Sequence, residues 1–199
     1  MRRYILLFPG FFVMSLGMVF IVQGNLGSDP WSVLHLGITN HLPVTLGQAN
    51  QLVGVLIIIT SYALGVKPTF ATVLNMFFVG FFIDIIQRTG LVPWSDSVFS
   101  GVFFVFLGSC LLALGIAMYV SLRLGAGPRD SLTLALASRT RSGVGPVRTT
   151  MELVCLAAGW ALGGPVGLGT LLSAASMGTM LAFWLRVLAR DGSRTGTTA

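Results

Sequence analysis

The sequence predicts an all-α integral membrane protein in which six transmembrane helices form two inverted three-helix repeats. Only 9% of the 199 residues are charged and 54% are hydrophobic, a balance that a water-soluble surface does not carry. The mean hydropathy of +0.87 agrees. In addition, the second half of the chain repeats the first half at a constant offset of 98 residues. We therefore expect a single membrane domain over residues 1–199.

Six apolar segments are long enough to cross a bilayer, which requires about 20 residues per helix. They are residues 4–23, 47–65, 69–88, 98–120, 145–163 and 167–188. The first has the basic start of a signal peptide, but it is too long and lacks a small-x-small cleavage site. We interpret it as a retained span. Residues 189–199 are expected to form a disordered cytoplasmic tail.

The basic residues predict the orientation. With the N-terminus inside, eleven of the twelve Lys and Arg residues face the cytoplasm and only Arg88 lies outside. Both termini are therefore expected in the cytoplasm. The net charge of +6 then reflects topology, so no nucleic-acid partner is expected. Aromatic residues near span ends are expected to be interfacial anchors: Trp31, Trp94, Trp160, Trp184, Tyr4, Tyr62 and Tyr119.

The repeat is anchored by "LGSDPWSVL" at residues 26–34 and "LGAGPRDSL" at residues 124–132. The same offset aligns glycines without a gap: Gly10 with Gly108, Gly17 with Gly115, Gly47 with Gly145 and Gly80 with Gly178. Repeat one covers residues 4–88 and repeat two covers residues 102–188. Each contains three spans, an odd number, so the second copy enters the membrane from the opposite side, as in many secondary transporters.

A short helix follows the first span of each repeat. Residues 30–42 are too short to cross but place apolar residues on one helical stripe. Either Ser28 or Asp29 is expected to cap this helix, with Pro30 in its first turn, and Gly127 with Pro128 takes these places in the second copy. Two placements remain open. The helix lies in the headgroup plane, or it is re-entrant and directs its N-terminus at a central cavity.

Polar residues inside spans are costly and commonly mark a pathway. The candidate substrate-pathway residues are Gly27, Asp29, Pro30, Asn50, Gln51, Asn75, Gly125, Pro128, Asp130, Arg148, Glu152 and Ser173. Glu152 is the most suggestive acid; it either pairs with Arg148 four residues earlier or couples transport to protons. Asp84 is expected to pair locally with Arg88. The paired glycines of the first and fourth spans are expected to serve close helix packing.

The sequence offers no catalytic site. It has no Ser/His/Asp constellation, no paired intramembrane aspartates and no phosphate-binding loop. His35 and His41 lie off a common helical face, so no metal is assigned to them. Cys110 and Cys155 lie in apolar runs, where buried thiols are expected. We therefore expect no cofactor and no enzymatic activity.

The two glycine-proline motifs, together with the length of the chain, resemble the YczE/YyaS/YitT-like bacterial membrane proteins, and the YczE type above all. The resemblance covers nearly the whole chain. It implies a multi-pass inner-membrane protein, with some relatives linked to production of antibiotics or other secondary metabolites and proposed as exporters. The family has no agreed catalytic residues, and only Gly27, Pro30, Gly125 and Pro128 carry over, as structural marks of the repeat.

Two functions remain open at this point. The first is a secondary transporter or exporter of a small organic molecule that works by alternating access of the two repeats. The alternative is a non-transporting scaffold or substrate-binding subunit that assists a biosynthetic or transport complex. Arginines between residues 123 and 148 could meet an acidic protein or anionic lipid. The expected partners are membrane lipid, an unknown small molecule and a second copy of the chain.

Overall fold

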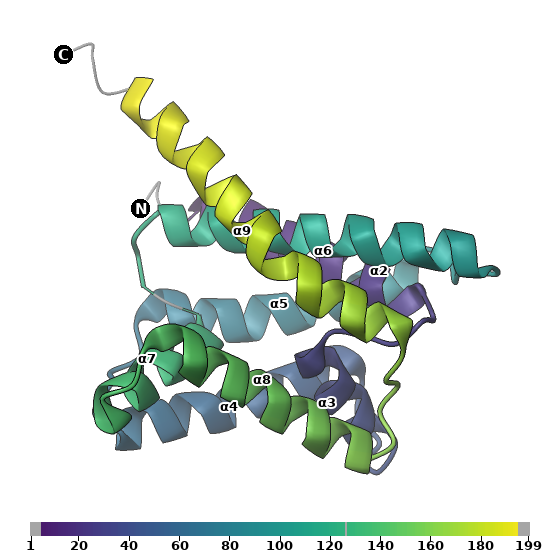
Figure 1. Cartoon of the computed structure of the whole chain (residues 1–199), viewed down its shortest axis with the longest axis horizontal. Helices are drawn as coiled ribbons and strands as arrows, with labels where there is room; N and C mark the ends of the chain where they lie inside the picture. The colour runs from purple at the N-terminus through teal and green to yellow at the C-terminus, as the bar shows by residue number, and fades with distance from the viewer. Residues whose placement is uncertain (1–4, 126, 195–199) are drawn as a thin grey trace.

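The computed structural model describes residues 5–125 and 127–194, and every helix or strand assigned there is an α-helix. In chain order the helices are α2 (Leu7–Gln23), α3 (Pro30–Thr39), α4 (Leu46–Ala63), α5 (Phe70–Thr89), α6 (Val98–Ser121), α7 (Pro128–Thr140), α8 (Val144–Ala161) and α9 (Leu168–Arg194) (Figure 1). The prediction of an all-helical protein is confirmed. Helix α9 includes residues 189–194, where a disordered tail was expected to begin, and residues 195–199 lie outside the described part.

Four helices of the described chain are long and apolar enough to cross a membrane: α4, α5, α6 and the Leu168–Ala189 part of α9. Helix α2 is apolar but has only 17 residues. Helix α8 has 18 residues, and its first turns carry Arg148 and Glu152, which lower its hydropathy. Length and composition therefore identify four candidate spans in the described chain, and the expected count of six stays a prediction.

The buried apolar side chains form two clusters. The larger one joins α2, α5 and α6 around side chains such as Phe11 and Ile83. The smaller one joins α3, α4, α7 and α8 around Trp31 and Met151. We call α2, α5, α6 and α9 the first helix group, since α9 packs on α6, and α3, α4, α7 and α8 the second helix group. Figure 1 shows α2, α6 and α9 on one side of the molecule and α3, α4 and α8 on the other.

Glycines allow α2 and α6 to pack with their backbones close together. A methyl group added at Gly108 would lie 2.6 Å from the carbonyl oxygen of Gly17, and one added at Gly115 would lie 2.7 Å from that of Gly10. Real Cβ atoms essentially never come within 3.0 Å of such a neighbour, so neither position has room for a larger residue. The predicted role of these glycines in close packing is confirmed. The two contacts are equivalent, because Gly10 and Gly17 of the first repeat correspond to Gly108 and Gly115 of the second.

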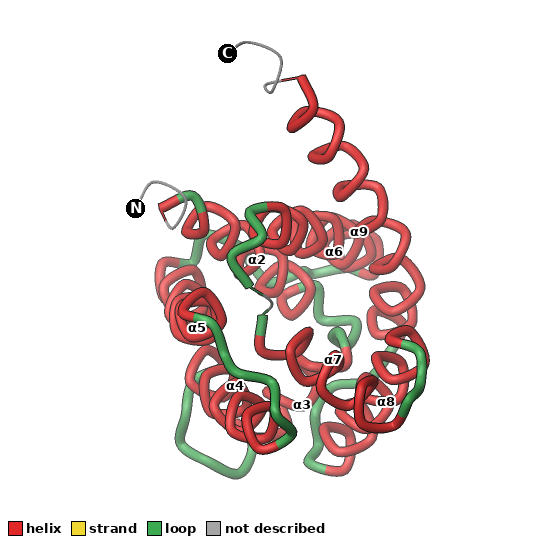
Figure 2. Tube along the Cα trace, turned by 90° about the vertical axis from the view of Figure 1, so that its left-hand side faces the viewer, coloured by secondary structure: helices red, strands yellow, loops and turns green. Residues whose placement is uncertain are grey.

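The two short helices lie inside the second helix group. Figure 2 shows α3 and α7 between α4 and α8, and both short helices contact both long ones. Asp29 is the N-cap of α3, because its carboxylate accepts a hydrogen bond from the backbone N–H of Ser32 at 3.2 Å, and Pro30 follows at the first position. Gly127 and Pro128 take the same places in α7. Of the two predicted caps for α3, the structure has Asp29.

The two equivalent long-helix pairs differ in how closely they pack. Helix α4 packs along α5, and Gly47 and Gly80 are buried where the two backbones meet. A methyl group on Gly80 would lie 2.5 Å from the carbonyl oxygen of Gly47. Helices α8 and α9 diverge, since α9 packs on α6, and Gly145 and Gly178 are exposed with no heavy atom within 4 Å of an added methyl group.

Candidate functional site

A cavity of about 320 Å³ lies between the two helix groups. The first helix group supplies a largely apolar wall that includes Met14, Val79 and Leu112. The second group supplies the N-termini of α3 and α7 and the first turns of α8, which carry most of the charge. Residues from α8 and α9 both line the cavity, so it extends into the space where these helices diverge.

Nine of the twelve candidate pathway residues line this cavity: Asp29, Pro30, Asn50, Asn75, Pro128, Asp130, Arg148, Glu152 and Ser173. The other three have positions that shape the fold. Gly27 and Gly125 have positive φ angles of 93° and 136°, in turns before the short helices where a larger residue would be strained. The Gln51 side chain donates from Nε2 to the backbone oxygen of Phe77 at 2.9 Å and so links α4 to α5.

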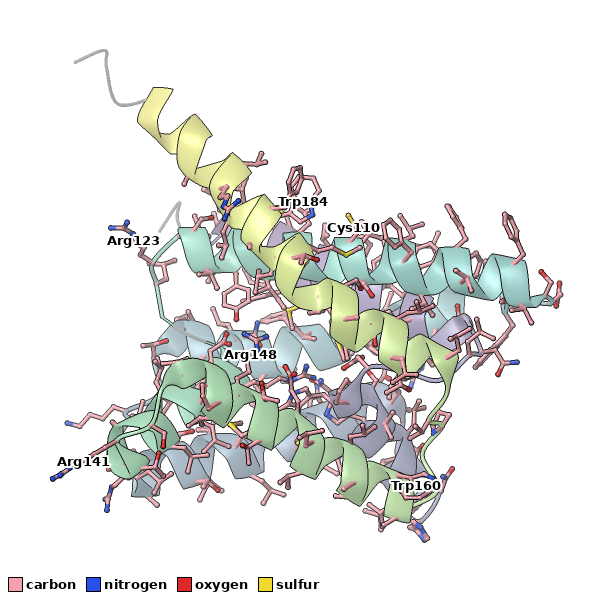
Figure 3. All side chains as sticks on the ribbon, viewed as in Figure 1. Cys110, Arg123, Arg141, Arg148, Trp160 and Trp184 are labelled. Carbon is pink, nitrogen blue, oxygen red and sulfur yellow. The ribbon has the colours of Figure 1, made fainter. Side chains whose placement is uncertain are left out.

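Four polar side chains on one side of the cavity form a connected cluster. The hydroxyl of Tyr119 donates to Asp130 at 2.6 Å. Arg148 lies 3.8 Å from the same carboxylate and donates from Nε to Glu152 at 3.2 Å. The predicted pairing of Arg148 with Glu152 is therefore present, and Asp130 extends it. Figure 3 shows Arg148 between the layer that contains α8 and the layer that contains α6 and α9, whereas Arg123 and Arg141 point away from the molecule.

Next to this cluster, the cavity is lined by Asp29, Trp31, His35 and Arg129. The guanidinium carbon of Arg129 lies 4.6 Å from the ring centroid of Trp31, a cation–π contact between α7 and α3. His35 is almost fully buried. Arg129 supplies the positive charge among these four residues.

The structure corrects three expectations from the sequence. Trp31 and Tyr119 are buried and line the cavity, although their places near span ends indicated interfacial anchors. Asp84 accepts hydrogen bonds from the Thr45 hydroxyl at 2.6 Å and from the Gly47 N–H at 2.9 Å. These bonds hold the start of α4 against α5, so Asp84 serves the contact between two helices rather than the predicted pair with Arg88.

Sequence reasoning missed several residues of the cavity: Trp31, His35, Ser109, Tyr119, Arg129 and Thr133. One signal was available for four of them. Trp31 and Arg129 are separated by the 98-residue offset of the repeat, and so are His35 and Thr133. Both pairs are polar or aromatic residues at equivalent places in the two short helices, although the residue types differ within each pair.

These features define a helical membrane protein whose two short helices direct their N-termini at one internal cavity. The chain belongs to DUF6198, described as a "Family of unknown function", which it matches over residues 1–186. The sequence-based identification of the family is confirmed by its relatives. No solved structure matches the chain.

Three relatives illustrate the family. The chain is 38% identical over 186 residues to the "Uncharacterized membrane protein YczE" of Bacillus subtilis (strain 168), covering 92% of this chain and 85% of that protein. It is 33% identical over 178 residues to an "Uncharacterized protein" of Haemophilus influenzae, covering 89% of this chain and 81% of the relative. The "Uncharacterized protein YyaS" of Bacillus subtilis is 26% identical over 186 residues, covering 91% of each chain.

Proposed function

We propose that this membrane protein is a secondary transporter of a small organic molecule, without enzymatic activity, that works by alternating access of two inverted repeats. In this proposal α2, α4 and α5 are the spans of the first repeat, and α6, α8 and α9 are those of the second. Helices α3 and α7 are re-entrant, which a membrane tolerates where such segments line protein or a water-filled cavity. The substrate binds near the midplane, at the N-termini of α3 and α7.

Contacts between the two halves support the symmetry. The approach of Gly10 to Gly115 has its counterpart in that of Gly108 to Gly17, as an axis of two-fold symmetry between α2 and α6 requires. The turns before the short helices behave likewise. Gly27 approaches Gly167, and Gly125 approaches Thr69, which is 98 residues before position 167.

The observation that carries the proposal is the unequal closure of equivalent helix pairs around one cavity. Gly47 and Gly80 bring α4 and α5 together, while their counterparts Gly145 and Gly178 are exposed and far from any neighbour. A transporter with inverted repeats passes between two states by exchanging the conformations of its halves. The second state would then close α8 on α9 through Gly145 and Gly178 and would separate α4 from α5.

The direction of the opening follows from the proposed topology. The N-terminus and C-terminus are placed in the cytoplasm of a bacterium, with the chain in the inner membrane, because Lys and Arg gather at that face. The diverging starts of α8 and ends of α9 then face the cytoplasm. The closed contact between the start of α4 and the end of α5 faces outward. The described conformation is accordingly open to the inside.

Double cysteine variants in a Cys110→Ser, Cys155→Ser background test alternating access. The outer pair is Gln51→Cys with Phe77→Cys, and the inner pair at equivalent positions is Thr149→Cys with Ala175→Cys. The purified protein is placed in proteoliposomes, and flux of a panel of labelled small organic molecules is measured under an imposed proton gradient. A short bismaleimide should join either pair, and each link should abolish flux.

The control pair lies between α2 and α6, which keep their contact in both states. Phe20→Cys with Phe104→Cys replaces two rings whose centroids are 5.3 Å apart, and this link should leave flux intact. The proposal is wrong if the inner pair never links, or if linking it leaves flux unchanged. Absence of flux for the whole panel from folded protein would favour the non-transporting scaffold instead.

A further inference from the structure

The cavity walls contain buried polar atoms that have no hydrogen-bond partner among the described residues. They are Oδ1 of Asp29, Nδ1 of His35, Nδ2 of Asn75, Oγ of Ser109 and Nη2 of Arg129, and all five residues line the cavity. The side chains of Asp29, His35, Asn75 and Ser109 are more than nine-tenths buried. Because a buried polar atom without a hydrogen-bond partner is unfavourable, several of them around one cavity indicate a binding site.

These atoms include both donors and acceptors. Arg129 and Asn75 offer N–H groups as donors. The carboxylate of Asp29 is an acceptor, and Nδ1 of His35 is an acceptor in the tautomer that carries its proton on Nε2. The two ion pairs of the described residues both belong to Arg148. Arg129 and Asp29 thus remain as opposite charges that interact through space without a direct ion pair.

The two helix N-termini at the cavity also differ. Asp29 caps α3 with its own carboxylate, so that end already carries a negative charge. Gly127 supplies no side chain to cap α7, and Arg129 stands in the first turn of this helix. The acid of the same turn, Asp130, is already bonded to Tyr119 and paired with Arg148. Asn75 lies next to this end, because a methyl group on Gly127 would be 3.6 Å from its side-chain oxygen. An anionic group fits at α7 and a cationic group fits at Asp29.

The sum of charges separates the ligand classes. The cavity is lined by three acidic residues, Asp29, Asp130 and Glu152, and by two arginines, Arg129 and Arg148, so acidic residues outnumber basic ones by one. A simple anion would add to that excess. A simple cation would leave the donors of Arg129, Asn75 and the α7 N-terminus unused. A molecule with both charges meets both requirements.

We propose that the cavity binds a small zwitterion of the amino-acid type, with its carboxylate at Arg129 and the N-terminus of α7 and its ammonium at Asp29. This rests on the proposed function, because it names the substrate class of the same cavity. The volume of about 320 Å³ is near the lower end of small-molecule sites, which suits a single amino acid rather than a peptide. The apolar wall formed by Met14, Val79 and Leu112 would receive the ligand's side chain.

Binding is tested on the purified full chain in lipid nanodiscs, independently of flux. The probes are the twenty proteinogenic L-amino acids and glycine betaine, screened by thermal shift and quantified by titration calorimetry. For the tightest ligand that has both groups free, its amide and its N-acetyl derivative are compared, since each removes one charge. At least one probe should bind, and both derivatives should bind at least ten-fold more weakly.

Two near-isosteric variants and two matched controls locate the site. Arg129→Gln and Asp29→Asn should each weaken binding of the tightest probe at least ten-fold. The N-acetyl derivative should bind Asp29→Asn as tightly as it binds the wild type, because it lacks the ammonium group that Asp29 is proposed to contact. Asparagine at this position still caps α3. Arg88→Gln and Asp96→Asn make the same charge changes at exposed positions and should leave binding unchanged.

The inference is overturned if no probe binds, if either derivative binds as tightly as the parent, or if the two cavity variants match the two controls. Loss of binding counts only where the variant keeps the elution profile and unliganded melting temperature of the wild type. A probe that binds with this pattern but does not cross proteoliposomes would leave this inference standing and would contradict transport.

Discussion

The guanidinium group of Arg129 lies over the indole ring of Trp31, 4.6 Å from its centroid, and each residue is the counterpart of the other at the 98-residue offset. Both stand at the second position of a short helix, directly after Pro128 and Pro30. The contact therefore joins α3 and α7 at the point where their N-termini meet the cavity. It couples the two halves of the chain through one pair of side chains.

Replacing Trp31 by leucine should loosen this junction. The variant loses the cation–π contact and part of a buried aromatic side chain, and we expect about 2 kcal/mol of destabilisation. The midpoint of unfolding in a titration with SDS measures the change. Trp94→Leu is the matched control, because this tryptophan is exposed and should cost little. Equal losses in both variants would show that the contact contributes nothing specific.

Glycine-to-alanine changes at equivalent positions should have opposite effects on stability. Gly47→Ala and Gly80→Ala place a methyl group against the facing backbone, which should destabilise the described conformation by about 1–3 kcal/mol. Gly145→Ala and Gly178→Ala meet no neighbour and should leave the unfolding midpoint unchanged or slightly raised. All four should reduce flux in proteoliposomes, since each obstructs one closed state. Normal flux in Gly178→Ala would contradict closure of α9 on α8.

Asp84 should hold the outer contact closed. Asp84→Asn weakens the hydrogen bonds from the Thr45 hydroxyl and the Gly47 N–H, and bonds to a charged acceptor contribute about 1.5–3 kcal/mol. We expect the conformations to shift towards the outward-open state. The rate at which a bismaleimide joins the cysteines at positions 149 and 175 should rise several-fold. Asp96→Asn is the control. An unchanged rate in Asp84→Asn would show that Asp84 does not hold the contact between α4 and α5 closed.

Glu152 is expected to serve its pairing with Arg148 rather than proton coupling. The two side chains are about one-third and two-fifths exposed, with relative accessibilities of 34% and 41%. A pair of this kind contributes about 0–1 kcal/mol, so Glu152→Gln should shift the unfolding midpoint little. Flux should keep its wild-type response to a pH gradient. The contrary result would be a wild type that requires the pH gradient and a Glu152→Gln variant that transports equally with and without it. That result would show that Glu152 couples transport to protons.

Close packing of α2 on α6 should be the least tolerant part of the fold. Gly17→Ala places a methyl group within 2.6 Å of the Gly108 carbonyl oxygen, and helix backbones cannot move apart without losing contacts along their length. We expect destabilisation of about 2–3 kcal/mol by SDS titration. Gly178→Ala serves again as the control for an unpacked glycine. A Gly17→Ala variant as stable as the wild type would mean that α2 and α6 pack less closely than the structure has them.

The sequence by itself determined the helical elements and the first residue of the two short helices, although α9 runs to Arg194 and α3 ends at Thr39, unlike the ranges expected for them. Apolar length predicted each long helix, and Pro30 and Pro128 marked the first residue of the two short ones, as the structure has them. The pair of Arg148 with Glu152 could also be predicted, because four residues along a helix make one turn. All of these features depend on residues within a few positions of one another, so the local sequence is sufficient to specify them.

Only the tertiary structure decided which distant residues meet. Trp31 and Tyr119 had the positions of interfacial anchors, yet packing buries both at the cavity. Asp84 has Arg88 about one helical turn away, but the start of α4 lies beside it and donates hydrogen bonds from the Thr45 hydroxyl and the Gly47 N–H. The separation of α8 from α9 is the clearest case, because the same pattern of glycines closes one pair of helices and leaves its counterpart open. A repeated sequence specifies both arrangements equally, and the contacts between whole helices select which half adopts which.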